Sequence, residues 1–211
     1  MGRWQGDARG RLEQAAMNLY REHGFAETTV AEIAARAGLT ERTFFRYFAD
    51  KREVLFWGAP LLERSIVEGI AAAPADAAPL EAVVAALAAA GAVFEERREG
   101  ARVRHALIQA NAELREREVM KLTSLGAAIA AALRARGVRE PGASLTAEAG
   151  IAIFKVGFER WLEDAGRRDF AHHLRAALGE LRGVVAEQGA AARRAPRTAR
   201  AAGRGRRSPA S

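Results

Sequence analysis

The stretch TTVAEIAARAGLTERTFFRYFADK, residues 28–51, decides the fold of this chain. Thr29 followed by Glu32 is typical of a capping box, in which a hydroxyl and a carboxylate satisfy free amides at a helix start. Gly38 then ends the helix after about two turns, because glycine adopts the left-handed backbone conformation of a tight turn without a Cβ clash. Thr40 can cap the next helix. The stretch therefore predicts two short helices joined by a turn.

The packing residues of this pair predict a helix-turn-helix. Small Ala34 permits a close crossing, and Leu39 and Phe44 fill the space between the two helices. The second helix leaves exposed a set of hydroxyl, guanidinium and aromatic side chains: Thr40, Arg42, Thr43, Phe45, Arg46 and Tyr47. Such groups suit phosphates and base edges in a major groove. The alternative is a helical hairpin of the core whose outer surface is merely polar.

The flanking residues extend the module in both directions. A leading helix is predicted by an apolar stripe at helical spacing, formed by Leu12, Ala15, Ala16, Leu19 and Tyr20. Gly24 ends this helix. Asp50 with Glu53 repeats the capping pattern and predicts a fourth helix that begins near Lys51 and runs through Trp57. Lys51 in its first turn would join free backbone amides in a phosphate clamp.

The whole composition favours an all-α protein. Ala, Leu, Arg and Glu dominate, and β-branched runs are missing. With the four N-terminal helices, further helical segments at 80–97, 101–111, 112–137, 144–165 and 169–188 give about nine helices. No stretch has the length and apolar character of a membrane span, and no signal core precedes the module, so we expect a cytoplasmic protein.

Several functional classes are disfavoured by residue content. The chain has no cysteine and four histidines, which excludes a thiolate site and argues against a metal or other cofactor. We find no Ser/His/Asp or Cys/His constellation, phosphate-cradling loop or HExxH spacing, so we expect no enzyme.

The net charge of +7 is concentrated at one end of the chain. Seven arginines and no acid follow Gly189: Arg193, Arg194, Arg197, Arg200, Arg204, Arg206 and Arg207. Taking these seven from the 33 basic residues leaves 26, against 26 acidic ones. The folded part is thus nearly neutral, and we expect residues 189–211 to form a disordered basic tail.

Residues 1–57 resemble the DNA-binding domain of the TetR family of bacterial regulators. The resemblance lies in the leading helix ending in HGF, then TTVAEIAARAGLT, TFFRYF and DK. It implies that Thr29 and Lys51 meet phosphates. It further implies that Thr40, Arg42 and Thr43 reach base edges, and that Phe45, Arg46 and Tyr47 lie against the sugar-phosphate backbone. Phe45 stands where the family usually has tyrosine, which removes a hydroxyl donor.

The resemblance also implies a function and an organisation. Residues 1–57 would bind a palindromic operator, and residues 58–188 would bind a small-molecule inducer and form a homodimer. Inducer binding would move the fourth helix and release the DNA, most simply as a repressor. The alternative function is a sequence-nonspecific architectural DNA-binding protein that uses its Arg-rich tail.

Two sets of residues in the second domain are candidates for these roles. The inducer pocket would be lined by eight residues: Phe94, His105, Leu107, Ile108, Met120, Leu122, Phe154 and Phe158. The dimer would use two stripes, Ile151, Phe154, Phe158 and Trp161 on one helix and Leu174, Leu178, Leu181 and Val185 on the next. Such stripes are also typical of a core. Gly150 and Gly157 would let another helix approach closely.

Overall fold

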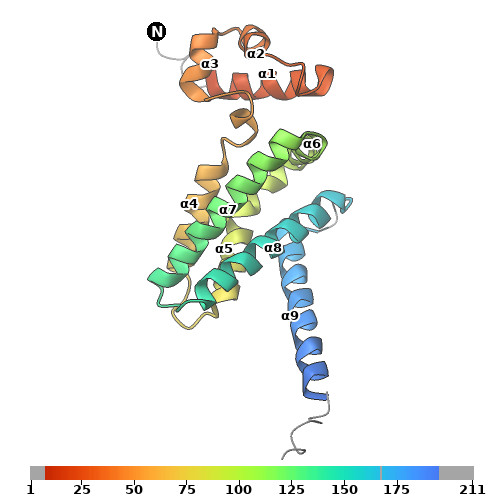
Figure 1. Ribbon diagram of the computed structural model, residues 1–211. Coiled ribbons are helices and arrows are strands. Elements are labelled where there is room, and N and C mark those ends of the chain that lie inside the picture. Colours follow the sequence, from red (N-terminus) through yellow and green to blue (C-terminus); the bar gives the residue numbers. More distant parts are fainter. Residues whose placement is uncertain (1–7, 167, 195–211) are drawn as a thin grey trace, which may run out of the picture.

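The computed structural model describes residues 8–166 and 168–194, and the regular elements in these two ranges are all helical (Figure 1). The all-α prediction is confirmed. An N-terminal group contains α1 (Ala8–His23), α2 (Val30–Arg36) and α3 (Glu41–Tyr47). A short 3-10 helix, η1 (Glu53–Leu55), follows and leads into the second group.

The second group is larger and forms the C-terminal domain. Its elements are α4 (Ala59–Ala72), α5 (Pro79–Ala90), the 3-10 helix η2 (Gly91–Arg97), α6 (Arg98–Ala110), α7 (Ala112–Ala135), α8 (Gly142–Glu163) and α9 (Phe170–Arg194). In Figure 1, α4 and α7 lie side by side below the N-terminal group, and the last turns of α9 extend away from the other helices.

The local signals between α1 and α3 are confirmed. Thr29 and Glu32 form the reciprocal capping box, and the Thr40 hydroxyl accepts a hydrogen bond from the Thr43 amide at 3.2 Å. Gly38 has φ +65°, the left-handed conformation that the turn between the two helices requires. Ala34 is buried.

Three predicted boundaries were wrong. No α-helix begins at Lys51: the Asp50 carboxylate caps only the η1 turn, and α4 begins at Ala59, with a proline in its first turn. The predicted helix 80–97 changes to 3-10 geometry at Gly91, where the Phe170 ring lies too close for any Cβ. Helix α9 continues through Arg194, so residues 189–194 are helical, while the rest of the predicted tail, 195–211, lies outside the described residues.

The C-terminal core shows why glycines stand on α8. A Cβ on Gly150 would come within 2.6 Å of Val83 on α5, and one on Gly157 within 2.9 Å of Leu174 on α9. Both glycines therefore allow a neighbouring helix of the same chain to approach α8. The predicted close approach is confirmed, and its partners are α5 and α9.

The N-terminal core includes residues from the second domain. Its large buried side chains come from α1 to η1: Leu12, Leu19, Tyr20, Phe25, Ile33, Phe44, Phe48, Val54, Leu55 and Phe56. Ile108 at the end of α6 and Leu114 at the start of α7 complete the same cluster, and both are fully buried. The corner between α6 and α7 is thus part of the hydrophobic core that supports the helix-turn-helix.

Lys51 fixes the turn that precedes α2. Its Nζ donates to the carbonyl oxygens of Phe25 at 2.8 Å, Ala26 at 2.9 Å and Thr28 at 2.8 Å. The ammonium also lies 4.6 Å from the centre of the Phe25 ring. Next to it, the Tyr20 hydroxyl donates to the Lys51 carbonyl oxygen at 2.7 Å, and burial raises the pKa of Tyr20. Lys51 is therefore a structural residue of the N-terminal domain.

We predict that Leu114→Ala lowers the free energy of unfolding by about 2–5 kcal/mol, because it opens a cavity in the N-terminal core although it lies on α7. Urea unfolding followed by circular dichroism measures this. Val119→Ala is the control, since Val119 is exposed on the same helix. Equal stability of the two variants would contradict the shared core.

We predict that Lys51→Met lowers the free energy of unfolding by about 1.5–3 kcal/mol, because three carbonyl oxygens lose one charged donor. Thermal unfolding measures the loss. Arg42→Gln, at an exposed position on α3, serves as the control and is expected to stay within about 0.5 kcal/mol of the parent protein. A Lys51→Met variant as stable as the Arg42→Gln variant would refute this role.

Candidate DNA-binding and ligand sites

Helix α3 has one buried side and one exposed side. Phe44 is fully buried against α1 and α2, while Arg42, Phe45 and Arg46 are exposed, Phe45 to 55%. Thr43 and Tyr47 are half-buried at the edges. A helix of only two turns thus carries two guanidinium groups and an aromatic ring on its outer surface, which suits contact with a nucleic-acid groove.

The threonine hydroxyls at the helix starts are held by local hydrogen bonds. Thr29 Oγ1 donates to Glu32 Oε2 at 2.9 Å and accepts from the Glu32 amide at 3.2 Å. The Thr29 amide and then its hydroxyl lower the pKa of Glu32. The hydroxyls of Thr40 and Thr43 lie 3.0 Å apart. These bonds fix where the hydroxyls lie. Thr29 Oγ1 keeps one acceptor position, while its proton is donated to Glu32.

Arg46 and Tyr47 form a pair on the outer side of α3. Arg46 Nη2 donates to the Tyr47 hydroxyl at 3.0 Å, and the guanidinium carbon lies 4.9 Å from the centre of the tyrosine ring. The pair restricts a long flexible side chain, so less rotamer entropy remains to be lost when it binds an anion. Sequence reasoning gave both residues and missed their contact, because adjacent helix positions ordinarily face different directions.

Four of the predicted ligand residues meet in the C-terminal domain. The ring centres of Phe94 and Phe158 lie 5.8 Å apart, and Phe154 stacks on Phe158 with 5.9 Å between their ring centres. His105 meets Phe158 edge to face at 6.0 Å. Phe170 joins from the start of α9, 5.6 Å from Phe94. Elements η2, α6, α8 and α9 thus contribute rings to one aromatic cluster.

Charged residues that sequence reasoning missed lie beside this aromatic cluster. Glu95 accepts a hydrogen bond from the Phe170 amide at 2.5 Å and one from Trp161 Nε1 at 3.4 Å. Arg98 lies 4.8 Å from the centre of the Trp161 ring and donates to the Trp161 carbonyl oxygen. No sequence pattern marks them, because η2 and α6 approach α8 only in the folded chain.

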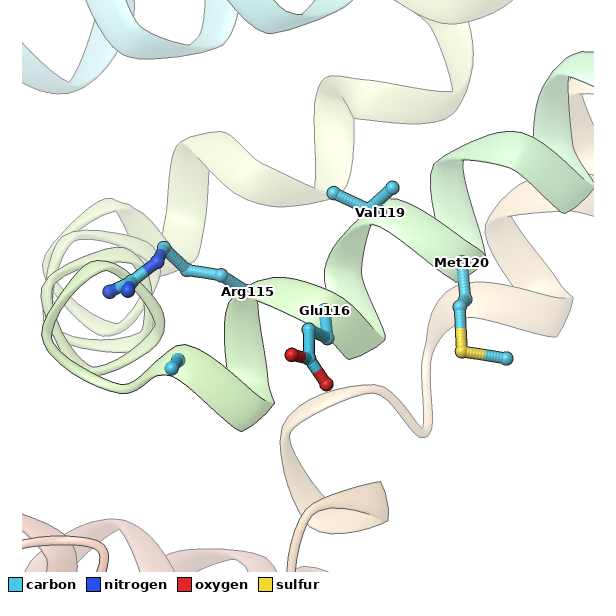
Figure 2. Close-up of a pocket in the computed structure, with 5 residues that line it drawn as sticks. Arg115, Glu116, Val119 and Met120 are labelled. Atoms are coloured by element: carbon cyan, nitrogen blue, oxygen red, sulfur yellow. The ribbon is translucent and has the colours of Figure 1, made fainter.

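The other predicted ligand residues lie elsewhere. Ile108 is buried in the N-terminal core and Leu107 packs against it, because the last turn of α6 has left the C-terminal core. Met120 is 58% exposed and lines an open pocket on α7 with Arg115, Glu116 and Val119 (Figure 2). Leu122 is partly buried against the C-terminal core.

The predicted dimer stripes are mostly core within one chain. Ile151, Trp161, Leu174 and Leu178 are buried, and Leu181 is partly buried against them. Val185 differs, with 65% of its surface exposed. The exposed large apolar side chains of α8 and α9 are Leu145, Val156, Val184 and Val185. The regular spacing of the stripes marks the inner side of each helix as far as Leu181. Val185 keeps that spacing and is nevertheless exposed, because the last turns of α9 extend away from the other helices.

Among the described residues, neither a metal site nor a membrane-spanning helix is found. Across residues 8–166 and 168–194, no group of three His, Asp or Glu side chains could hold a metal ion. None of the described helices combines the length and the apolar character that crossing a bilayer would need.

Two family models match successive parts of the chain. The model described as bacterial regulatory proteins of the tetR family matches residues 13–56, which contain most of α1 and all of α2, α3 and η1. The model described as the MftR C-terminal domain matches residues 77–186, from just before α5 into α9.

Two curated relatives are similar over part of the chain. The regulator TcmR of Streptomyces glaucescens is 34% identical over 81 residues, 38% of this chain and 36% of TcmR. MftR of Mycobacterium tuberculosis, a transcriptional regulator named for mycofactocin biosynthesis, is 36% identical over 58 residues, 28% of this chain and 29% of its own. The chain thus spans about a third of the length of the curated relatives it matches.

Solved structures share the fold over most of the chain. The regulator FadR of Bacillus subtilis, in complex with stearoyl-CoA, has a TM-score of 0.57 at 17% identity over 81% of this chain and 95% of its own. SmeT, the repressor of a Stenotrophomonas maltophilia multidrug efflux pump, has a TM-score of 0.53 at 20% identity over 81% of this chain and 86% of its own. With its helix-turn-helix and its helical second domain matched in turn by the two models, this chain belongs to the TetR family of bacterial transcriptional regulators.

Proposed function

We propose that this protein is a dimeric repressor that binds a palindromic operator and leaves it when a small molecule binds. The observation that carries the proposal is α3, a short helix with Phe44 buried on one side and two arginines exposed on the other. Two such helices in a two-fold dimer would enter successive major grooves of one operator. A protein that regulates transcription in this way works in the bacterial cytoplasm.

Individual contacts follow from the exposed groups. Arg42, with Thr40 and Thr43, is suited to base edges, since guanidinium can bind guanine bidentately. The paired Arg46 and Tyr47 are suited to the sugar-phosphate backbone.

The remaining proposed contacts have other chemistry. Phe45 has no donor and can touch a thymine methyl group. Thr29 would donate to a phosphate once its hydroxyl turns away from Glu32, which accepts its proton in this structure. Lys51 supports the same phosphate through its charge, because its three carbonyl partners occupy its donors.

The division of labour places DNA binding in residues 1–57 and ligand binding and dimerisation in residues 58–188. We assign the inducer to the aromatic cluster around Phe94, His105, Phe154 and Phe158, whose rings suit an apolar ligand. We assign the dimer contact to the exposed side of α8 and α9, where Val156 and Val185 lie. The dimer can adopt conformations that differ in the distance between its two α3 helices. The ligand changes operator affinity only to the extent that it binds one of these conformations more tightly than the other.

We predict that Arg42→Ala weakens binding to the preferred duplex by about 1–3 kcal/mol, or about 5- to 150-fold, because a bidentate base contact is lost. The duplex is the one that the unmodified protein recovers from a random-sequence pool, and fluorescence anisotropy gives the Kd. Arg64→Ala, which removes the same charge from an exposed position on α4, should bind like the parent protein. Equal losses in both variants would mean that Arg42 acts only through net charge.

The architectural alternative finds no support among these relatives, and the same assay tests it. A scrambled duplex that displaces the protein as well as the preferred one would show binding without sequence preference. Truncation after Arg194 removes five of the seven arginines beyond Gly189. Retained preference in this shortened chain would assign operator recognition to the helix-turn-helix.

We predict that Val185→Glu shifts the chain from dimer toward monomer, because a charge would be buried in the proposed contact between two copies of α8 and α9. Sedimentation velocity at several concentrations measures the shift. Val119→Glu is the matched control, since Val119 is similarly exposed on α7. A dimer as stable as the parent would move the contact away from the end of α9.

A further inference from the structure

Glu53 joins the helix-turn-helix to the C-terminal domain. It stands in η1, at the C-terminal end of the DNA-binding module. Its Oε1 accepts a hydrogen bond from Arg117 Nε at 2.6 Å, and its Oε2 lies 3.3 Å from Lys121 Nζ. Arg117 and Lys121 are one turn apart on α7, so they face the same side of that helix. The carboxylate therefore bridges two cations of the other domain.

The Glu53 bridge is shielded from solvent. The three side chains are between 19% and 31% exposed, so salt screens them less than a surface pair. The Glu53 backbone is fixed as well, since the Asp50 carboxylate accepts hydrogen bonds from the amides of Arg52 at 2.8 Å and Glu53 at 3.2 Å. Removing one partner of a shielded pair leaves the other charge uncompensated.

Arg104 on α6 makes a second polar connection to the same turn. Its Nε donates to the Leu55 carbonyl oxygen at 2.7 Å, and its guanidinium carbon lies 4.9 Å from the centre of the Phe56 ring. Glu118 on α7 lies 3.5 Å from its Nη1. Together with the buried Ile108, these contacts attach η1 to both α6 and α7.

Helix α4 has a different position in this connection. It follows η1 directly in the chain, yet its buried residues, Ile66 and Ile70, belong to the C-terminal core. The side-chain contacts that hold the N-terminal module are thus made by the α6–α7 corner. Helix α4 connects the two domains along the chain, and the side chains of the α6–α7 corner hold the N-terminal module in its orientation.

We propose that Glu53 is a positioning residue for operator binding, which holds α3 at a defined orientation to the C-terminal domain through Arg117 and Lys121. The inference rests on the proposed function, because the orientation matters when two α3 helices must match two half-sites. Without the bridge, each module samples more orientations. Binding to the correct half-site spacing then loses more entropy, and binding to a wrong spacing is penalised less.

The test compares two half-site spacings with Glu53→Gln, which keeps the side-chain size and removes the charge. One duplex is the palindrome that the unmodified protein recovers from a random pool. The other has one inserted base pair, which moves the half-sites by about 3.4 Å and turns them by about 35°. We expect Glu53→Gln to weaken binding to the first duplex about fivefold or more, and to reduce the ratio of the two Kd values by a similar factor.

Charge-reversal variants and their rescue distinguish a positioning role of Glu53 from a general role in stability. Glu53→Arg should lower the spacing ratio further, and the double variant with Arg117→Glu should restore it toward the parent value. Glu116→Gln is the control, since it removes an exposed acid from α7, the helix of Arg117 and Lys121, and leaves the Glu53 bridge intact. Lys121→Gln, which leaves Arg117 in place, is the milder second variant if Glu53→Gln unfolds, and it should lower the ratio less.

The outcomes distinguish the two levels of the proposal. Equal losses on both duplexes, with an unchanged ratio, would show a general structural role and overturn the positioning role. Unchanged affinity and ratio would overturn it too, as would a Glu116→Gln variant that changes the ratio as much as Glu53→Gln. If the unmodified protein recovers no duplex from the pool, the proposed function fails first, and the positioning role fails with it.

Discussion

The burial of Ile108 and Leu114 in the N-terminal core is the constraint on which the structure depends. A three-helix module buries a smaller fraction of its surface than a larger domain does, so its own core is marginal for stability. Here further apolar surface comes from the corner of α6 and α7, where both side chains are fully buried. The DNA-binding module and the ligand-binding domain therefore share part of one core, and each constrains the position of the other.

Cations at carbonyl oxygens are the second recurring device. Lys51 binds three carbonyls of the turn before α2, Arg102 donates to the Leu162 carbonyl at the end of α8, and Arg136 donates to carbonyls of Ile70, Ala73 and Pro74 at the end of α4. Positive charge near a helix C-terminus interacts favourably with the helix dipole. These three basic residues of the folded part thus have a structural role, so their charge does not mark a DNA-binding surface.

Several features that depend on neighbouring residues could be predicted from the sequence. The capping box of Thr29, the left-handed Gly38 and the buried Phe44 are local, and all three are confirmed. The role of Lys51 and the place of Ile108 depend on contacts between distant segments, which no spacing records. The stripes on α8 and α9 correctly predicted that most of their residues are buried, but they did not identify the helices that cover them. Helical periodicity marks the inner side of a helix without saying which helix packs on it.

The shared core also constrains synthesis. Domains generally fold as units from the N-terminus while the chain is being made. The helix-turn-helix stands first in the sequence, yet its core lacks Leu114 until α7 begins to emerge from the ribosome. A nascent chain therefore carries an incomplete DNA-binding module until the start of α7 has been translated, although the module itself ends near residue 57.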